Sequence, residues 1–143
     1  MAKLTRSIHI KAPAEKVYNF LTEPSNLPEV WPSMVEVNNI HHEPTGLHKF
    51  HWKYKMAGVI FEGETDTVEA VPSKRVVTQT SGGIPSRFEW TYRSEGNEMT
   101  LDVSVEYTVP IPVLGKLAEP VIVKLNEHEA ETLLANIKTT MEA

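Results

Sequence analysis

The sequence predicts an α+β fold in which a curved antiparallel sheet of about seven strands wraps around one long C-terminal helix, with two short helices after the first strand. Three patterns carry this prediction. Apolar and polar residues alternate over residues 3–12, as in a strand with one buried face. The same period of two returns over residues 34–109, where short turns separate the runs, as in an antiparallel meander. Over residues 117–141 apolar residues recur at every fourth position, which indicates an amphipathic helix.

Two short helices are expected after the first strand. Pro13 suits the first position of a helix, because its missing N–H needs no partner there, and Pro24 ends the segment. The apolar residues of this helix follow at helical spacing: Ala14, Val17, Tyr18 and Leu21. A second helix is predicted over residues 27–31, with Asn26 as its cap and Glu29 three residues later.

Six further strands are expected before the last helix. One face of these strands is rich in aromatic residues, while the other carries Lys, Glu and Asp. Residues 81–86 join two of the strands, either as an ordinary hairpin connection or as a mobile lid over one end of a pocket. The predicted runs are residues 35–37, 50–56, 61–67, 75–80, 88–92 and 101–107.

The apolar stripe of the C-terminal helix is predicted to consist of Leu117, Val121, Leu125, Leu133, Ile137 and Met141, broadened by Ala118, Ile122 and Leu134. Pro120 either opens this helix or kinks it, since a proline removes a helical hydrogen bond. His128 and Glu129 interrupt the stripe near its middle. They point either into a pocket, where they would bind a carbonyl or hydroxyl group, or to the solvated flank beside Glu127.

Length and composition exclude several classes of protein. The 143 residues are expected to form one domain, residues 1–143. A net charge of −5 gives no reason to bind nucleic acid, so no nucleic-acid partner is expected. The most apolar stretch, residues 109–125, is interrupted by Pro, Lys and Glu, and no stable membrane insertion is expected. Without cysteine or a signal-peptide pattern, the chain is predicted to be cytoplasmic, as a monomer or a weak dimer.

No metal site and no cofactor are expected. His41 and His42 are adjacent, so on a strand they face opposite sides of the sheet. An H-E-x-x-H pattern beginning at His128 is incomplete, because Thr132 stands where the second histidine would be. The sequence therefore offers no set of ligands at metal-binding spacing.

Four segments carry a resemblance to a known family. Residues 8–17 read apolar-x-apolar-x-Ala-Pro-x-x-x-Val, and the other segments are residues 26–32, 114–120 and 131–138. With these segments the chain resembles, over nearly its whole length, the START-like (SRPBCC) superfamily, the polyketide cyclase/dehydrase and lipid-transport group with the helix-grip fold. The resemblance implies an apolar ligand held between the sheet and the C-terminal helix. It also implies a carrier or sensor, or an enzyme that closes aromatic rings, because the family includes both.

Aromatic side chains on the inward strand faces form the candidate pocket. A pocket for an apolar molecule needs a mostly aromatic and aliphatic lining with a few polar groups, although the same residues could simply form the core. Trp31 is expected near the pocket mouth. The predicted ligand-binding residues are Trp52, Tyr54, Phe61, Phe88, Trp90, Tyr92, Tyr107, Leu117, Val121, Leu125 and His128.

Three functions fit this pattern. The preferred prediction is a non-enzymatic binding or carrier protein for a lipid, isoprenoid, quinone or polyketide-like molecule. The alternative is a cyclase or dehydratase, for which His128, Glu129, Glu69 and the tyrosines are the available acids and bases. None of these groups forms a convincing pair, so no catalytic residue is assigned. A protein-interaction module is the third function, and it predicts a filled interior and an exposed apolar patch.

Overall fold

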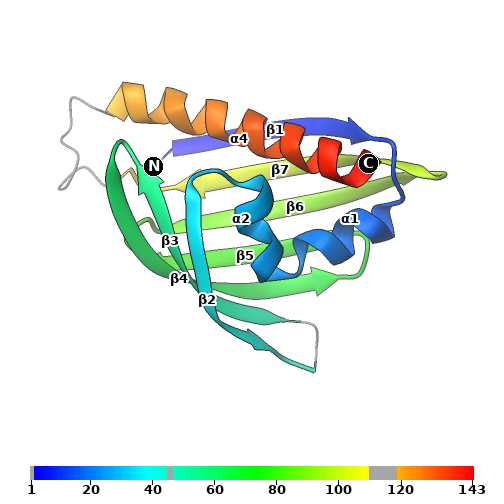
Figure 1. The fold of residues 1–143 in the computed structure, drawn as a ribbon, viewed down its shortest axis with the longest axis horizontal. Coiled ribbons are helices and arrows are strands. Elements are labelled where there is room, and N and C mark those ends of the chain that lie inside the picture. Colours follow the sequence, from blue (N-terminus) through cyan, green and yellow to red (C-terminus); the bar gives the residue numbers. More distant parts are fainter. Residues whose placement is uncertain (1, 45–46, 110–118) are drawn as a thin grey trace.

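A single curved antiparallel sheet dominates the structure, which is a computed structural model describing residues 2–44, 47–109 and 119–143 (Figure 1). Within these ranges seven strands lie in the order β1-β7-β6-β5-β4-β3-β2, so β1 and β2 form the edges. The predicted α+β helix-grip fold is confirmed. The elements are β1 (Ala2–Ile10), α1 (Ala14–Leu21), the 3-10 helix η1 (Pro24–Asn26), α2 (Leu27–Val30), β2 (Met34–His42), β3 (His48–Met56), β4 (Val59–Val71), β5 (Arg75–Gly82), β6 (Ser86–Glu95), β7 (Glu98–Tyr107) and α4 (Glu119–Glu142).

The helices cover one face of the sheet. α4 packs along β1, α2 packs on β2 and α4, and α1 packs on β6 and α4 (Figure 1). Pro13 lies one residue before α1, where its extended backbone leads the chain into the helix. Asn26 precedes α2 as predicted, but its side-chain amide donates to the Phe20 carbonyl oxygen at 3.0 Å and does not cap α2. This bond fixes the turn between the two helices.

The alternation of the strands places one face of the sheet in the core. The predicted inward faces of β3, β6 and β7 are confirmed, and the buried side chains of these strands are Phe50, Trp52, Met56, Trp90, Tyr92, Met99, Leu101, Val103, Val105 and Tyr107. The outer face carries ion pairs between neighbouring strands, such as Arg93 with Asp102 at 2.6 Å. Exposed pairs of this kind contribute about 0–1 kcal/mol each, so burial on the inner face provides most of the stability.

The edge strand β2 departs from the predicted alternation. Its pairing with β3 shifts register between Met34 and Glu36 and again between Asn38 and His41. The first shift places Met34 in the core and leaves Val35 exposed. An irregularity of this kind adds a residue to one strand and changes the face that the next side chain meets.

The C-terminal helix buries one part of the predicted apolar stripe and exposes the other. Leu133, Ile137 and Met141 are buried as expected, but Val121 is 60% exposed and Leu125 is 49% exposed. A residue four positions along a helix lies about 40° further round, so a strict four-residue stripe turns away from the core within two or three steps. Pro120 is the second residue of α4 as described, and the segment before Glu119 lies outside the described residues, so the choice between opening and kinking the helix stays a prediction. None of the helices in the described ranges is long and apolar enough to cross a membrane.

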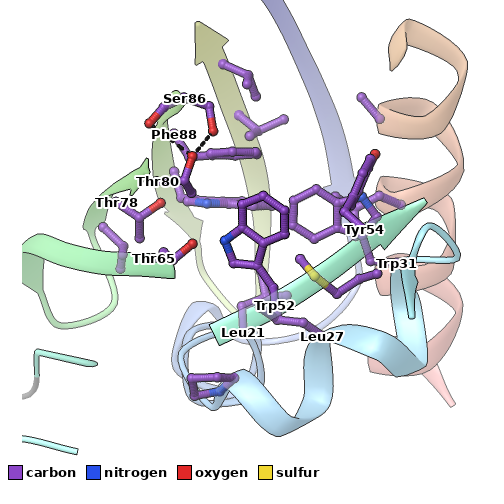
Figure 2. A pocket seen from close by; sticks show the side chains of 18 of the residues that line it. Leu21, Leu27, Trp31, Trp52, Tyr54, Thr65, Thr78, Thr80, Ser86 and Phe88 are labelled. Atoms are coloured by element: carbon purple, nitrogen blue, oxygen red, sulfur yellow. Dashed lines mark hydrogen bonds between the residues drawn. The ribbon is translucent and has the colours of Figure 1, made fainter. Parts of the chain in front are cut away.

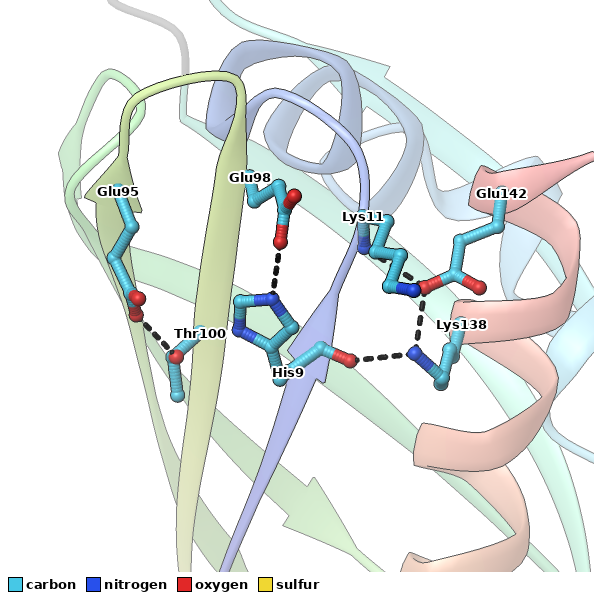
Figure 3. A network of polar contacts seen from close by, with 7 residues as sticks. All are labelled: His9, Lys11, Glu95, Glu98, Thr100, Lys138 and Glu142. Atoms are coloured by element: carbon cyan, nitrogen blue, oxygen red, sulfur yellow. Dashed lines mark hydrogen bonds and ion pairs between the residues drawn. The ribbon is translucent and has the colours of Figure 1, made fainter.

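Polar contacts hold the C-terminal end of α4 against β1 (Figure 3). The Lys138 ammonium donates to the His9 carbonyl oxygen at 2.9 Å and pairs with the Glu142 carboxylate at 2.6 Å. That carboxylate also accepts a hydrogen bond from the Lys11 N–H at 2.8 Å. The last turn of α4 is therefore fixed at the point where β1 ends.

We expect acid to loosen this contact. The Lys138 ammonium, and to a smaller degree the Lys11 N–H, hold the pKa of Glu142 below its usual value of 4.5. A lowered folded-state pKa gives a contribution to stability that is complete above pH 4.5 and is lost as the pH falls through the lowered value. The Tm of the wild-type protein should therefore exceed that of Glu142→Gln at neutral pH, and the difference should disappear in acid. A Tm difference that is independent of pH would contradict this account.

Candidate ligand-binding site

A cavity of about 140 Å³ lies between the inner face of the sheet, α2 and α4. Its walls are mainly aromatic and aliphatic, with contributions from Leu27 of α2, Met34 of β2 and Leu133 of α4. In Figure 2 the Trp52 indole lies between a group of threonines on one side and Tyr54 and Trp31 on the other. This composition suits a mostly apolar molecule with a few polar groups.

Six of the predicted aromatic residues line this cavity. Trp31 lies there too, and its ring packs edge-on against Tyr54 and Phe88 at centroid distances of 5.9 and 5.5 Å. Phe61 is buried but is not part of the lining. The six lining residues are Trp52, Tyr54, Phe88, Trp90, Tyr92 and Tyr107. Their contact with a ligand remains a prediction.

The predicted positions on the last helix do not reach the cavity. Val121, Leu125 and His128 are exposed and are not part of the lining, so their predicted place in the pocket is wrong. Leu117 lies outside the described residues. The helix turns Asn126, Glu129, Ala130 and Leu133 toward the cavity instead. Of the two polar residues that interrupt the stripe, Glu129 therefore lines the cavity and His128 does not.

The sequence prediction missed a wall of hydroxyl groups on β4, β5 and β6. Thr65 faces Thr80 across β4 and β5, Thr67 faces Thr78, and Thr80 faces Ser86. The Thr80 hydroxyl donates to the Ile84 carbonyl oxygen at 3.0 Å and also contacts the Ser86 hydroxyl. Thr65 and Thr67 share the parity of Phe61 in the sequence, and this signal could have placed them in the lining.

The hydroxyl wall ends at the connection between β5 and β6. β5 extends two residues further than predicted, to Gly82, and the Gly83 N–H donates to the Glu62 carbonyl oxygen at 2.9 Å. Ile84 is buried and adds an apolar side chain to the lining. In this structure residues 81–86 form a hairpin connection whose backbone is bonded to β4.

Gly63 makes room for the central indole of the cavity. It lies opposite Trp52 in the pairing of β3 with β4 and opposite Gly82 in the pairing of β4 with β5. A Cβ atom at Gly63 would overlap the Trp52 indole carbons and the Ser81 carbonyl oxygen. Since the φ angle of Gly63 is not in the left-handed region, space and not backbone conformation requires glycine here.

Polar side chains gather where the cavity meets α4. The Ser33 N–H donates to Glu129 Oε1 at 2.8 Å and holds this carboxylate in place. Burial, and then the negative charge of Glu129, raise the pKa of Tyr54 to about 12, and burial raises the pKa of Tyr107. Both tyrosines therefore remain neutral hydroxyl groups at physiological pH. The Asn126 amide lies close enough to Tyr107 to affect its pKa in the opposite direction.

The cavity lining contains a single carboxylate among the described residues, that of Glu129. No group of three or more His, Asp or Glu side chains in these residues is arranged to hold a metal ion. The arrangement can bind a molecule through apolar contact and orient it through the hydroxyl, amide and carboxylate groups near α4.

The match to a family model decides the relationship of this chain to known proteins. A model described as polyketide cyclase / dehydrase and lipid transport matches residues 1–142. The chain belongs to this family. The comparison with curated proteins gives no match.

Solved structures support the fold of this member of the polyketide cyclase / dehydrase and lipid transport family. A Thermus thermophilus protein has 18% identity and a TM-score of 0.84, with 96% of this chain and 95% of that one covered. The Zhui aromatase/cyclase of a Streptomyces species has 13% identity and a TM-score of 0.75, with 95% and 93% covered. A START superfamily protein of Mycobacterium smegmatis has 14% identity and a TM-score of 0.74, with 98% and 97% covered. At these identities the likeness shows the fold alone.

Proposed function

We propose that this protein is a non-enzymatic binding protein that holds an apolar or amphipathic small molecule between the sheet and α4. The observation that supports the proposal is the cavity of about 140 Å³, with its aromatic walls and few polar groups. Burial of the ligand's carbon skeleton would supply most of the affinity, at about 25 cal/mol per Å² before the cost of ordering the ligand. An interaction module is less well supported, because it predicts a filled interior.

The size of the cavity favours a compact, ring-containing ligand. An engineered apolar cavity of about 150 Å³ takes up benzene, so about 140 Å³ accommodates a single ring without movement of the walls. Pockets for drug-sized ligands measure about 300–1,000 Å³. A lipid or isoprenoid chain would therefore need the walls to move, whereas the ring of a small quinone or polyketide would not.

Two measurements test the proposal. Native mass spectrometry of the protein purified from its host, followed by organic extraction, should reveal a stoichiometric apolar adduct. An NMR titration with p-xylene, a ring-sized probe, should shift signals from residues that line the cavity. A bare protein that does not bind p-xylene and gains no thermal stability from lipids, quinones or polyketides would contradict the proposal.

Filling the cavity should abolish p-xylene binding. Ala130 lines the cavity on α4, so Ala130→Leu places three additional carbon atoms in the space that the ring would occupy. The larger side chain should cost about 1–3 kcal/mol of stability, as overpacking usually does. Ala135→Leu is the matched control, because Ala135 is exposed on the same helix. Equal binding of p-xylene by both variants would show that the ligand lies elsewhere.

Glu129 supports a second candidate function, that of a cyclase or dehydratase. Its carboxylate lines the cavity beside Tyr54, which remains a neutral donor because its pKa is about 12. Glu129 would take the proton from a carbon between two carbonyl groups, and the resulting enolate would attack a carbonyl carbon of the same molecule while Tyr54 donates to the carbonyl oxygen. Incubation with a linear poly-β-ketone tests this candidate. Cyclised product from the wild type but not from Glu129→Gln would establish it, and unchanged substrate would reject it.

A further inference from the structure

Two neighbouring polar groups at the α4 end of the cavity are buried without a hydrogen bond to any residue that the structure describes. The Tyr107 hydroxyl and the Asn126 Nδ2 atom are both shielded from solvent, and they lie close enough together for Asn126 to act on the pKa of Tyr107. The Tyr107 side chain belongs to the cavity lining and only 4% of the residue is exposed. Buried donors are nearly always satisfied in folded proteins, and each one left unpaired destabilises the structure. Both groups could be satisfied by a polar atom of a bound molecule.

An acceptor stands beside these donors. Glu129 lies three residues after Asn126, which places both side chains on the same face of α4. The Ser33 N–H donates to Glu129 Oε1, and Oε2 is the second acceptor atom of this carboxylate. The negative charge of Glu129 acts on the Tyr54 hydroxyl, which places both groups at the same end of the cavity. In Figure 2 the Tyr54 hydroxyl lies beside the α4 ribbon.

This set of groups is complementary to a hydroxyl group. A hydroxyl donates one hydrogen bond and accepts others, so it can donate to Glu129 while it accepts from Tyr107 or Asn126. A carbonyl oxygen could only accept, so it would form no hydrogen bond with the Glu129 carboxylate. A ligand carboxylate would lie beside the like charge of Glu129, and the two charges would repel each other.

We infer that Glu129, Tyr107 and Asn126 form a subsite that recognises the hydroxyl group of a neutral, ring-containing molecule and rejects carboxylates. The inference rests on the proposed binding function and specifies the ligand as a phenol or a similar ring alcohol. It also separates this protein from carriers of free fatty acids, whose head group carries the wrong charge for this subsite.

Three probes of similar shape test the subsite: p-cresol, p-xylene and p-toluate. p-Cresol has a hydroxyl where p-xylene has a methyl group, so the pair isolates the polar contact. In NMR titrations of the wild-type protein, p-cresol should bind about tenfold more tightly than p-xylene, since hydrogen bonds to charged groups are among the stronger ones. p-Toluate should bind more weakly than either. The ratio of p-cresol affinity to p-xylene affinity should fall in Glu129→Gln and in Tyr107→Phe.

A control variant and a folding check complete the test. Thr91→Val removes a hydroxyl from β6 outside the cavity lining and should keep the p-cresol preference. Tyr107→Phe deletes a buried hydroxyl without a described partner, so this variant should be at least as stable as the wild type. If p-cresol and p-xylene bind equally, the subsite is wrong while the binding function stands. If no probe binds, both proposals fall.

Discussion

Replacing Gly63 with alanine is expected to lower the free energy of unfolding by about 3 kcal/mol or more, because the new methyl group has no space on either side. The added Cβ would overlap the Trp52 indole and the Ser81 carbonyl oxygen. The indole can move only into the cavity, and the carbonyl belongs to a strand that is hydrogen-bonded to β4. A variant that still folds should therefore also lose p-xylene binding.

Gly96→Ala is the matched control for this substitution. Gly96 has a φ angle of +67° and no atom near its additional Cβ position, so alanine there meets backbone strain but no clash. That strain costs about 1–2 kcal/mol. Chemical denaturation of both variants should rank Gly63→Ala as the more destabilised. A Gly63→Ala protein with wild-type stability and wild-type p-xylene affinity would show that Trp52 does not lie against Gly63.

The second large effect is expected on α4. Leu134→Ala should lower the free energy of unfolding by about 2–5 kcal/mol, because Leu134 is 3% exposed and its removal leaves a void in the core. Leu125→Ala changes the same side chain on the same helix, but Leu125 is 49% exposed and should cost no more than about 0.5 kcal/mol. Urea denaturation of the two variants measures both values. Equal losses would mean that α4 is rotated from the orientation described above.

The sheet could be predicted from the sequence because its strands have one solvent-exposed face and one buried face. In β6 the aromatic residues Phe88, Trp90 and Tyr92 alternate with Arg87 and Glu89, and only one assignment of faces keeps the charged residues in water. The cavity position of these three aromatic side chains followed directly from that parity. The alternation of apolar and polar residues along each strand was thus enough to predict most of the fold and the aromatic part of the cavity lining.

The edge strand and the last helix were harder to predict because their orientation depends on contacts distant in the sequence. The register shift in β2 that exposes Val35 arises in its pairing with β3. On α4, apolar residues at every fourth position suggested a stripe that includes Val121 and Leu125, but contacts with β1, α1 and α2 bury only the side of the helix that carries Ile122 and Leu134. Adjacent residues on a helix point in directions about 100° apart, so His128 and Glu129 cannot both face the cavity. The observed orientation of α4 directs Glu129 to the cavity and leaves His128 outside it.

The irregular edge of the sheet also bears on how copies of this protein meet one another. An open sheet has two edges at which a neighbouring molecule could add a strand and begin an aggregate. α4 lies along β1 at one edge. At the other edge β2 is broken by two register shifts and by Asn39, whose φ angle of 50° bends the strand. The free N–H and C=O groups of β2 therefore do not form a straight row, and this edge is a poor template for growth of the sheet from one molecule into the next.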